Sequence, residues 1–299
     1  MHPVTIALSW VDRRVALGSL EASTAEDYRK SIRSWSPLPE NPTKWDVEDA
    51  VALMLSQGRA PSTVKKRIVT MRKAMDYAVE RGLMESNPFV GVERPKCSRR
   101  QHNYVRPEER SRLVAKATES NSQVTVAASL ALFAGLREGE VCALRLSDVD
   151  LESKVGWVRR AVGREKGRTY LKASKNEHMR DFPIPDRLAM VLGRWVDTNS
   201  LHGDSFLLTG TEKWCDPIVL GRKWFALCDV EGYVGALGKR PSFHDLRHTY
   251  ATVAISAGVD VKTVQSVLGH SSAAMTLDVY AVADPAAKRM SAELVGSAI

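Results

Sequence analysis

The chain has 299 residues and a formal net charge of +8. That length exceeds the roughly 100 to 200 residues of a typical domain and predicts two domains, and the excess of Lys and Arg favours a polyanionic partner such as nucleic acid. The four cysteines are spaced like neither zinc ligands nor a dense disulfide framework, and no run approaches the roughly 18 apolar residues of a membrane span, so we expect a cytoplasmic protein with reduced thiols.

The first 90 residues are predicted to be helical throughout. Apolar residues recur at helical spacing in segments that begin at Ser23, Trp45 and Ser62, and the third segment runs to Gly82. This third helix carries five basic residues within nine positions, more than a merely solvated face needs. They are Lys65, Lys66, Arg67, Arg72 and Lys73. We expect them to contact a phosphate backbone or groove.

A basic, extended linker is predicted after this helical region. Asn87-Pro88 ends the third helix, and residues 91–104 contain four basic positions. These are Arg94, Lys96, Arg99 and Arg100. The predicted organisation is therefore a helical domain over 1–90, a linker over 91–104 and a second domain over 105–299. Both halves carry net positive charge, which suits two lobes that close around one duplex.

The second domain is predicted to be mainly α, with a small three-stranded antiparallel sheet. Arg106-Pro107 begins a helix, and an apolar helix over 124–134 ends at Gly135. Three strands are expected over 155–162, 169–173 and 179–184, with turns at Gly163, Gly167 and Asn176, and helices resume after Pro185.

Three short motifs in this domain carry candidate chemistry. The first is Gly135-Leu136-Arg137 with Glu140, where an arginine beside a helix end suits an anion clamp, although this motif alone favours a structural Arg–Glu ion pair. The second is His244-Asp245-Leu246-Arg247-His248, in which the first histidine and the arginine share a helix face. We assign His248 to packing. The third is Leu268-Gly269-His270, followed ten residues later by Tyr280.

The order and spacing of these motifs resemble the tyrosine recombinases, the phage integrase family. The resemblance implies a helical, SAM-like core-binding domain and an α-rich catalytic domain that clamp DNA. It implies that Arg137, Arg247 and His270 bind the scissile phosphate, that His244 assists deprotonation of the nucleophile Tyr280, and that Glu140 supports the network. It also implies a general-acid lysine on a β-hairpin. Lys175, which precedes an Arg-x-x-Pro run at Arg180, is the first candidate, and Lys172 is the alternative.

The family mechanism cleaves DNA through a 3′-phosphotyrosyl bond and exchanges strands through a Holliday junction, without metal, ATP or another cofactor. The implied partners are double-stranded DNA attachment sites and three further copies of the chain, which we expect to be monomeric before it binds DNA in a bacterial cytoplasm. The tail after about residue 283 is expected to dock on a neighbouring protomer or on its own domain. Because the first helix begins almost at once, we expect no arm-binding domain.

Two other functions stay open at this stage: a type IB topoisomerase, which shares the tyrosine chemistry without strand exchange, and a catalytically inactive DNA-binding relative. A metal-dependent nuclease is disfavoured because no Asp or Glu pair accompanies the histidines. The sequence does not choose among integration, excision, resolution and inversion, nor does it define the target site or the need for a directionality factor.

Overall fold

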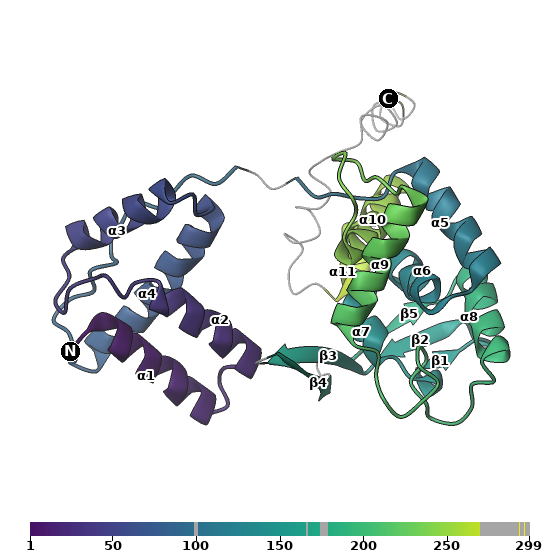
Figure 1. Ribbon diagram of the computed structural model, residues 1–299, viewed down its shortest axis with the longest axis horizontal. Coiled ribbons are helices and arrows are strands. Elements are labelled where there is room, and N and C mark those ends of the chain that lie inside the picture. The colour runs from purple at the N-terminus through teal and green to yellow at the C-terminus, as the bar shows by residue number, and fades with distance from the viewer. Residues whose placement is uncertain (99–100, 166, 174–178, 270–292, 294–295, 297–299) are drawn as a thin grey trace. The chain divides into compact units, whose positions relative to one another are not determined.

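The structure, a computed structural model, describes residues 1–98, 101–165, 167–173, 179–269, 293 and 296 (Figure 1). The chain divides into two compact units, Met1–Arg99 with Arg164–Arg168, and Arg100–Gly163 with Thr169–Ile299. The architecture is mostly helical with small antiparallel sheets, which confirms the predicted fold class. The division near residue 99 falls within the predicted linker, whose limits remain a prediction.

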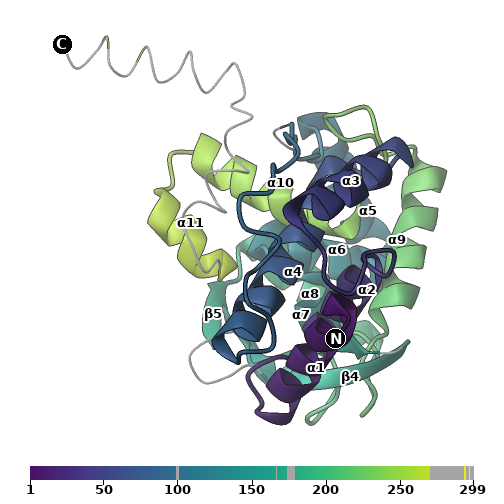
Figure 2. The same cartoon turned by 90° about the vertical axis from the view of Figure 1, so that its left-hand side faces the viewer.

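The first unit is a helical bundle. Its helices are α1 (Pro3–Ala16), α2 (Ala22–Arg33), α3 (Lys44–Ser56) and α4 (Pro61–Glu80), drawn in purple and blue in Figure 2. Helix α4 packs against the other three. Trp35 is completely buried in the core and meets Phe89 edge-on, with ring centroids 5.0 Å apart. The three helices predicted from Ser23, Trp45 and Ser62 are confirmed to within two residues at their starts.

The second unit is built around one helix that is apolar on all sides. Its helices are α5 (Pro107–Ser120), α6 (Gln123–Ala134), α7 (Glu138–Ala143), α8 (Asp186–Thr198), α9 (Pro217–Glu231), α10 (Phe243–Ser256) and α11 (Val261–Leu268), with a 3-10 turn at Leu146–Asp148. Helix α6 contacts α5, α7, α8, α9 and α10. A helix surrounded in this way needs no polar face, which explains its predominantly apolar sequence.

The strands form two separate antiparallel sheets, which corrects the predicted single sheet. They are β1 (Val149–Asp150), β2 (Val155–Val158), β3 (Arg160–Glu165), β4 (Arg168–Ala173) and β5 (Arg180–Pro183). One sheet has the order β1-β2-β5, and β3 pairs with β4 alone. The segment predicted as one strand over 155–162 therefore divides between the two sheets.

A buried carboxylate explains the division at Arg159. Asp148 lies within 3.6 Å of Arg159 and within 3.0 Å of Arg160, two adjacent residues. Adjacent side chains in a continuous strand point to opposite faces, so a break at Arg159 lets both side chains approach Asp148 from the same side. The predicted turn at Gly163 is also wrong, because Gly163 lies within β3 and a Cβ there would be 2.7 Å from the Tyr170 ring. The turn falls at Gly167, with φ of 83°.

Neither the cysteines nor the helices indicate a disulfide scaffold or a membrane anchor. All four cysteines are free thiols, and three of them are buried. In the described parts of the chain, every helix is too short or too polar to cross a membrane.

Candidate active site

The first motif joins the end of α6 to the start of α7. Gly135 ends α6 in the left-handed conformation, with φ of 65°, and Arg137 is the N-cap of α7. A Cβ at Gly135 would lie 2.5 Å from Leu268 and 3.0 Å from Tyr250. Glycine therefore satisfies the backbone conformation and also lets α10 and α11 approach this turn closely.

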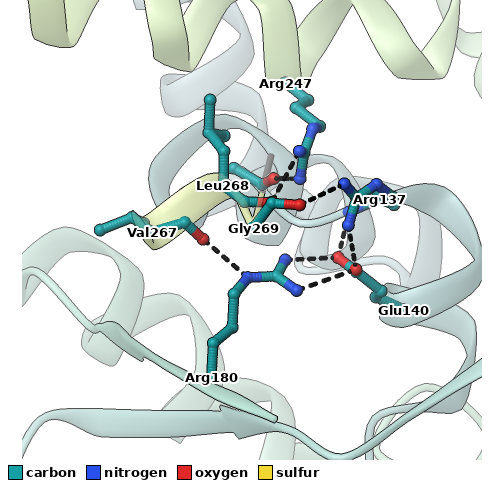
Figure 3. Close-up of polar contacts among 8 residues, drawn as sticks. Arg137, Glu140, Arg180, Arg247, Val267, Leu268 and Gly269 are labelled. Carbon is teal, nitrogen blue, oxygen red and sulfur yellow. Dashed lines mark hydrogen bonds and ion pairs between the residues drawn. The ribbon is translucent and has the colours of Figure 1, made fainter. Parts of the chain in front are cut away.

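Glu140 lies at the centre of the site and accepts hydrogen bonds from two arginines (Figure 3). Arg137 donates to it through its backbone N–H and through Nη1, both at 2.8 Å. Arg180, at the start of β5, donates through Nη1 at 3.0 Å and Nη2 at 2.7 Å. Burial alone would raise the pKa of the Glu140 carboxyl, but the hydrogen bonds and charge of Arg180, followed by Arg137, hold that pKa at about 2. Glu140 is therefore an anion at neutral pH.

Three consecutive backbone carbonyls at the end of α11 accept hydrogen bonds from three arginines (Figure 3). The pairs are Arg180 Nε to Val267 at 2.7 Å, Arg247 Nη2 to Leu268 at 2.7 Å and Arg137 Nη2 to Gly269 at 2.8 Å. The last carbonyls of a helix lack partners within the helix and carry partial negative charge. The guanidinium groups therefore hold the backbone that leads directly to position 270.

Arg247 is almost completely buried, with 2% of its surface exposed. Besides Leu268, it donates through Nη1 to the Gly135 carbonyl at 2.7 Å, so one side chain ties α10 to the ends of both α6 and α11. Burial, and then the charge of Arg137, lowers the pKa of Arg247 to about 9. The group still carries its positive charge at neutral pH.

His244 belongs to a row of three imidazole rings. It lies in the first turn of α10, and its ring centroid is 4.6 Å from that of His248, which in turn lies 4.5 Å from His102. Loss of hydration, and then the charge of Arg247, lowers the pKa of His244 below its ordinary value. A neutral imidazole at neutral pH can accept a proton. The half-buried His248 packs between the other two rings, as predicted.

The described cluster carries a net charge of +2, because it contains three guanidinium groups and one carboxylate. Arg180 and Arg247 are largely buried, whereas the Arg137 side chain is 39% exposed. Such an arrangement can bind and neutralise an oxyanion. No group of three or more His, Cys, Asp or Glu side chains that could hold a metal ion occurs among the residues the structure describes.

Several of the predicted site residues lie outside the described residues. These are Lys175, His270, Tyr280, Arg99 and Arg100, together with almost all of the tail after residue 283. Lys172, the alternative to Lys175, lies in β4 and is half-buried. The structure does bring Arg137, Glu140 and Arg247 together, and it places His244 on the same helix as Arg247.

Arg180 is the residue of this cluster whose role the sequence motifs did not reveal. In the sequence it belongs only to the Arg-x-x-Pro run that follows Lys175. Its position three residues before Pro183 was the available signal, but nothing local in the sequence names Glu140 as its partner.

The basic residues predicted to contact DNA in the first unit differ in exposure. Lys65, Lys66 and Lys73 of α4 are exposed, as are Arg94 and Lys96 further along the chain. Arg67 and Arg72 are half-buried, and Arg67 lies 3.3 Å from the Met54 sulfur. Burial, and then the charge of Arg59, lowers the pKa of Arg67. Contact of all these residues with DNA stays a prediction.

The chain belongs to the phage integrase family, whose model matches residues 103–286, and it is a tyrosine site-specific recombinase. It is 27% identical over 273 residues to a tyrosine recombinase of Thermosipho africanus, covering 88% of this chain and 89% of the relative.

Solved integrase structures share the fold. The Tn1549 transposon integrase in complex with a circular intermediate DNA matches with a TM-score of 0.79 at 19% identity, over 98% of this chain and 99% of that one. A λ integrase tetramer bound to a Holliday junction matches with a TM-score of 0.65 at 19% identity, over 89% of this chain and 76% of that one.

Proposed function

We propose that this recombinase cleaves and rejoins DNA through a covalent 3′-phosphotyrosyl bond on Tyr280. The phenolic oxygen of Tyr280 attacks the scissile phosphorus, the bond from phosphorus to the 5′-oxygen breaks, and a free 5′-hydroxyl leaves. Attack by the 5′-hydroxyl of a second strand reverses these steps and releases the tyrosine. The number of phosphoester bonds is unchanged, so neither ATP nor a redox cofactor is needed.

Two proton transfers accompany this exchange. The free pKa of tyrosine is about 10, so Tyr280 needs a base near neutral pH, and the neutral imidazole of His244 is suited to accept its proton. Lys175 donates a proton to the departing 5′-oxygen, with Lys172 as the alternative. Arg137, Arg247 and His270 bind the non-bridging oxygens and stabilise the charge that grows on them in the transition state.

The arginine cluster is the observation that carries this proposal. Arg137 and Arg247, 110 positions apart in sequence, both donate to the end of α11, immediately before His270. Glu140 fixes the direction of the Arg137 guanidinium. Fixed cations whose charge exceeds that of their buried counter-ion are suited to stabilise a phosphate transition state without metal.

We also propose that strands are exchanged through a Holliday junction. The chain would be monomeric in solution and would assemble into a tetramer on double-stranded attachment sites. The fold shared with the λ integrase tetramer supports this assembly. Residues 1–90 would bind the same duplex as the catalytic domain over 105–299, through the basic residues of α4 and of the linker over 91–104. Because its substrate is DNA, we propose that the recombinase acts in the cytoplasm of a bacterial cell, on the nucleoid.

Covalent capture tests the proposed nucleophile. A library of nicked duplexes with a randomised core is incubated with the full chain, and covalently bound sequences are recovered and amplified. We expect Tyr280→Phe to retain DNA binding but to form no covalent complex, and we expect the wild-type complex to form equally in EDTA. A covalent complex with the Phe variant, or a loss of cleavage in EDTA that Mg²⁺ restores, would contradict the proposal.

The general acid can be assigned with a modified substrate. A 5′-bridging phosphorothiolate has a better leaving group and does not need protonation. Its use should restore the cleavage rate of Lys175→Ala and leave any defect of Lys172→Ala unchanged. Restoration of Lys172→Ala alone would reverse the assignment.

Strand exchange separates recombination from the topoisomerase alternative. The sequence recovered by covalent capture is placed on two duplexes of different length. We expect recombinant products and a four-way intermediate, whereas relaxation of supercoiled DNA without recombinants would favour a topoisomerase. Mapping the two cut positions would also give the overlap length.

A further inference from the structure

Arg180 makes more contacts with the cluster than its position outside the three motifs suggests. It opens β5, where its backbone is paired with Val158 of β2, so the sheet determines where its side chain begins. From there the guanidinium reaches Glu140 of α7 with two parallel hydrogen bonds and the Val267 carbonyl of α11 with a third. The side chain is 12% exposed.

The turn after α11 is shaped to accept this arginine. Gly269 has φ of 62°, and a Cβ there would lie 3.1 Å from Cδ and 3.2 Å from Nε of Arg180. The carbonyl of the same glycine accepts from Arg137. Because Gly269 has no side chain, Arg180 packs directly against its backbone, and the Gly269 carbonyl is hydrogen bonded to Arg137.

Glu140 accepts hydrogen bonds from two arginines, which bind it in different ways. Arg137 gives it one terminal nitrogen and the backbone N–H, whereas Arg180 gives it two terminal nitrogens. Without Arg180, the buried carboxylate would retain only Arg137 as a hydrogen-bonding cation. A carboxylate favours bidentate pairing with a guanidinium, so it would draw the second terminal nitrogen of Arg137 away from Gly269.

We infer that Arg180 is a positioning residue for the recombination chemistry, which holds Glu140 and the end of α11 so that Arg137 is correctly placed for the scissile phosphate. This inference rests on the proposed function. Three of the five N–H donors of Arg180, including one on each terminal nitrogen, are committed within the protein. Arg180 therefore acts through Glu140 and the Val267 backbone.

A second arginine that pairs with a buried carboxylate away from the site serves as a control, which separates an effect on the reaction from an effect on stability. Arg160 of β3 also pairs with a buried carboxylate of the same unit, at 3.0 Å from Asp148, and its side chain is 20% exposed. It makes no hydrogen bond to the described arginine cluster. Arg160→Met therefore removes a comparable ion pair away from the site.

The first experiment compares Arg180→Met with Arg160→Met in the full chain on the nicked duplex recovered by covalent capture. Misplacement by about 1 Å can cost on the order of a hundredfold in rate, so we expect Arg180→Met to slow covalent attachment by about 10- to 100-fold while the Kd for DNA stays within about threefold. Arg160→Met should keep its attachment rate. Equal rate losses in the two variants, or a normal rate in Arg180→Met, would overturn the inference.

A conservative variant keeps the test usable if Arg180→Met does not fold. Arg180→Lys retains a positive charge but cannot make two parallel hydrogen bonds, nor the bond from Nε to Val267. One of the two bonds to Glu140 and the bond to Val267 are lost, and a loss of even one hydrogen bond to a charged group corresponds to about a tenfold change, so we expect an attachment rate at least about tenfold below wild type. A rate equal to that of the wild type would contradict a need for the guanidinium geometry.

The pH dependence gives a readout that a merely structural role would not move. The charged groups that face Glu140 are Arg137 on its own element, Arg180 on β5 and Arg247 on α10. Removing Arg180 raises the pKa of Glu140, so Arg180→Met should show, besides the acidic limb that belongs to the general base, a second loss of attachment rate on acidification that lies at higher pH than in the wild type. In Glu140→Gln this dependence should disappear, and adding Arg180→Met should cost little more, because the two residues act as a unit.

Absence of this second, Glu140-dependent loss in Arg180→Met, or fully additive losses in the double variant, would overturn the inference. Wild-type protein that forms no Tyr280-dependent covalent complex would refute the proposed function itself, and with it this role. A wild type that forms the complex beside an unimpaired Arg180→Met would refute only the role of Arg180.

Discussion

The guanidinium of Arg247 is hydrogen bonded to the backbone carbonyl of Gly135 at 2.7 Å, across 112 positions of sequence. Gly135 exposes this carbonyl where α6 ends in a left-handed residue, and Arg247 reaches it from the first turns of α10. Through Arg247, the second motif is thus hydrogen bonded directly to Gly135 of the first motif. A residue expected to bind phosphate is held by protein groups on one side, which limits the orientations that its free donors can adopt.

Replacing Arg247 with lysine should weaken both the fold and the reaction. An ammonium group cannot reach the Gly135 and Leu268 carbonyls together, and a buried carbonyl without a partner costs about 1 to 3 kcal/mol. We expect this loss in urea unfolding of the full chain and a cleavage rate lower by about a hundredfold or more. The control is Arg240→Lys, which alters an exposed pair with Asp229 and should change stability by less than about 1 kcal/mol. Equal stability of the two variants would contradict the buried role.

Gly269→Ala should be more damaging than the same change at another helix end. Gly232 ends α9 with φ of 68° and Gly269 ends α11 with φ of 62°, so both alanines incur a similar backbone strain of about 1 kcal/mol. A Cβ at Gly232 meets nothing within 4 Å, whereas at Gly269 it would contact Arg180. We expect Gly269→Ala alone to slow covalent attachment, measured on the nicked duplex. Comparable rates for the two variants would show that the arginine contact is unimportant.

The contribution of Glu140 to stability should depend on pH with a definite sign. Its pKa is about 2 in the folded chain and near its ordinary value of 4.5 when unfolded, so its stabilisation is complete above about pH 5 and is lost as pH falls toward 2. A shift of that size corresponds to roughly 3 kcal/mol. Glu140→Gln should therefore be destabilised at neutral pH, and its difference from wild type should shrink on acidification in urea unfolding monitored by tryptophan fluorescence. The exposed Glu152→Gln serves as the control. A difference that is constant with pH would refute this assignment.

His244 should still be able to act as the general base at pH values below those at which histidine ordinarily takes up a proton. Because the folded environment lowers the pKa of His244, the imidazole stays neutral at neutral pH and protonates only as pH falls below about 6.5. We expect the acidic limb of the rate on the phosphorothiolate substrate to lie below that value, to vanish in His244→Gln and to persist in His202→Gln, which changes an exposed histidine. An acidic limb above about 6.5, or one unaffected by His244→Gln, would exclude His244 as this base.

Local sequence was sufficient for most helices and for the identity of the motifs. The apolar run of α6 ends at Gly135 because a left-handed residue favours glycine, and Asp260 and Gly269 bound α11 for the same kind of local reason. Hydrophobic spacing identified α4 with its basic side. Such features depend on residues a few positions apart, which is why they can be predicted without knowledge of the fold.

The sheet pairing was decided by contacts between distant residues. Strand β2 pairs with β5, although β3 and β4 lie between them in sequence, and Gly156 accommodates the buried ring of Phe182 directly opposite. No local pattern distinguishes this arrangement from three consecutive strands in one sheet.

The sequence by itself determined which arginines, histidines and tyrosine this recombinase carries and in which order. Only the tertiary structure decided that Arg180 pairs with Glu140, that Arg247 is buried against Gly135, and that three arginines converge on the end of α11. The physical reason is that the residues next to an arginine in sequence do not reveal whether its guanidinium is solvated, paired or buried. Its partner is chosen by the packing of elements that lie up to 132 positions apart in the chain.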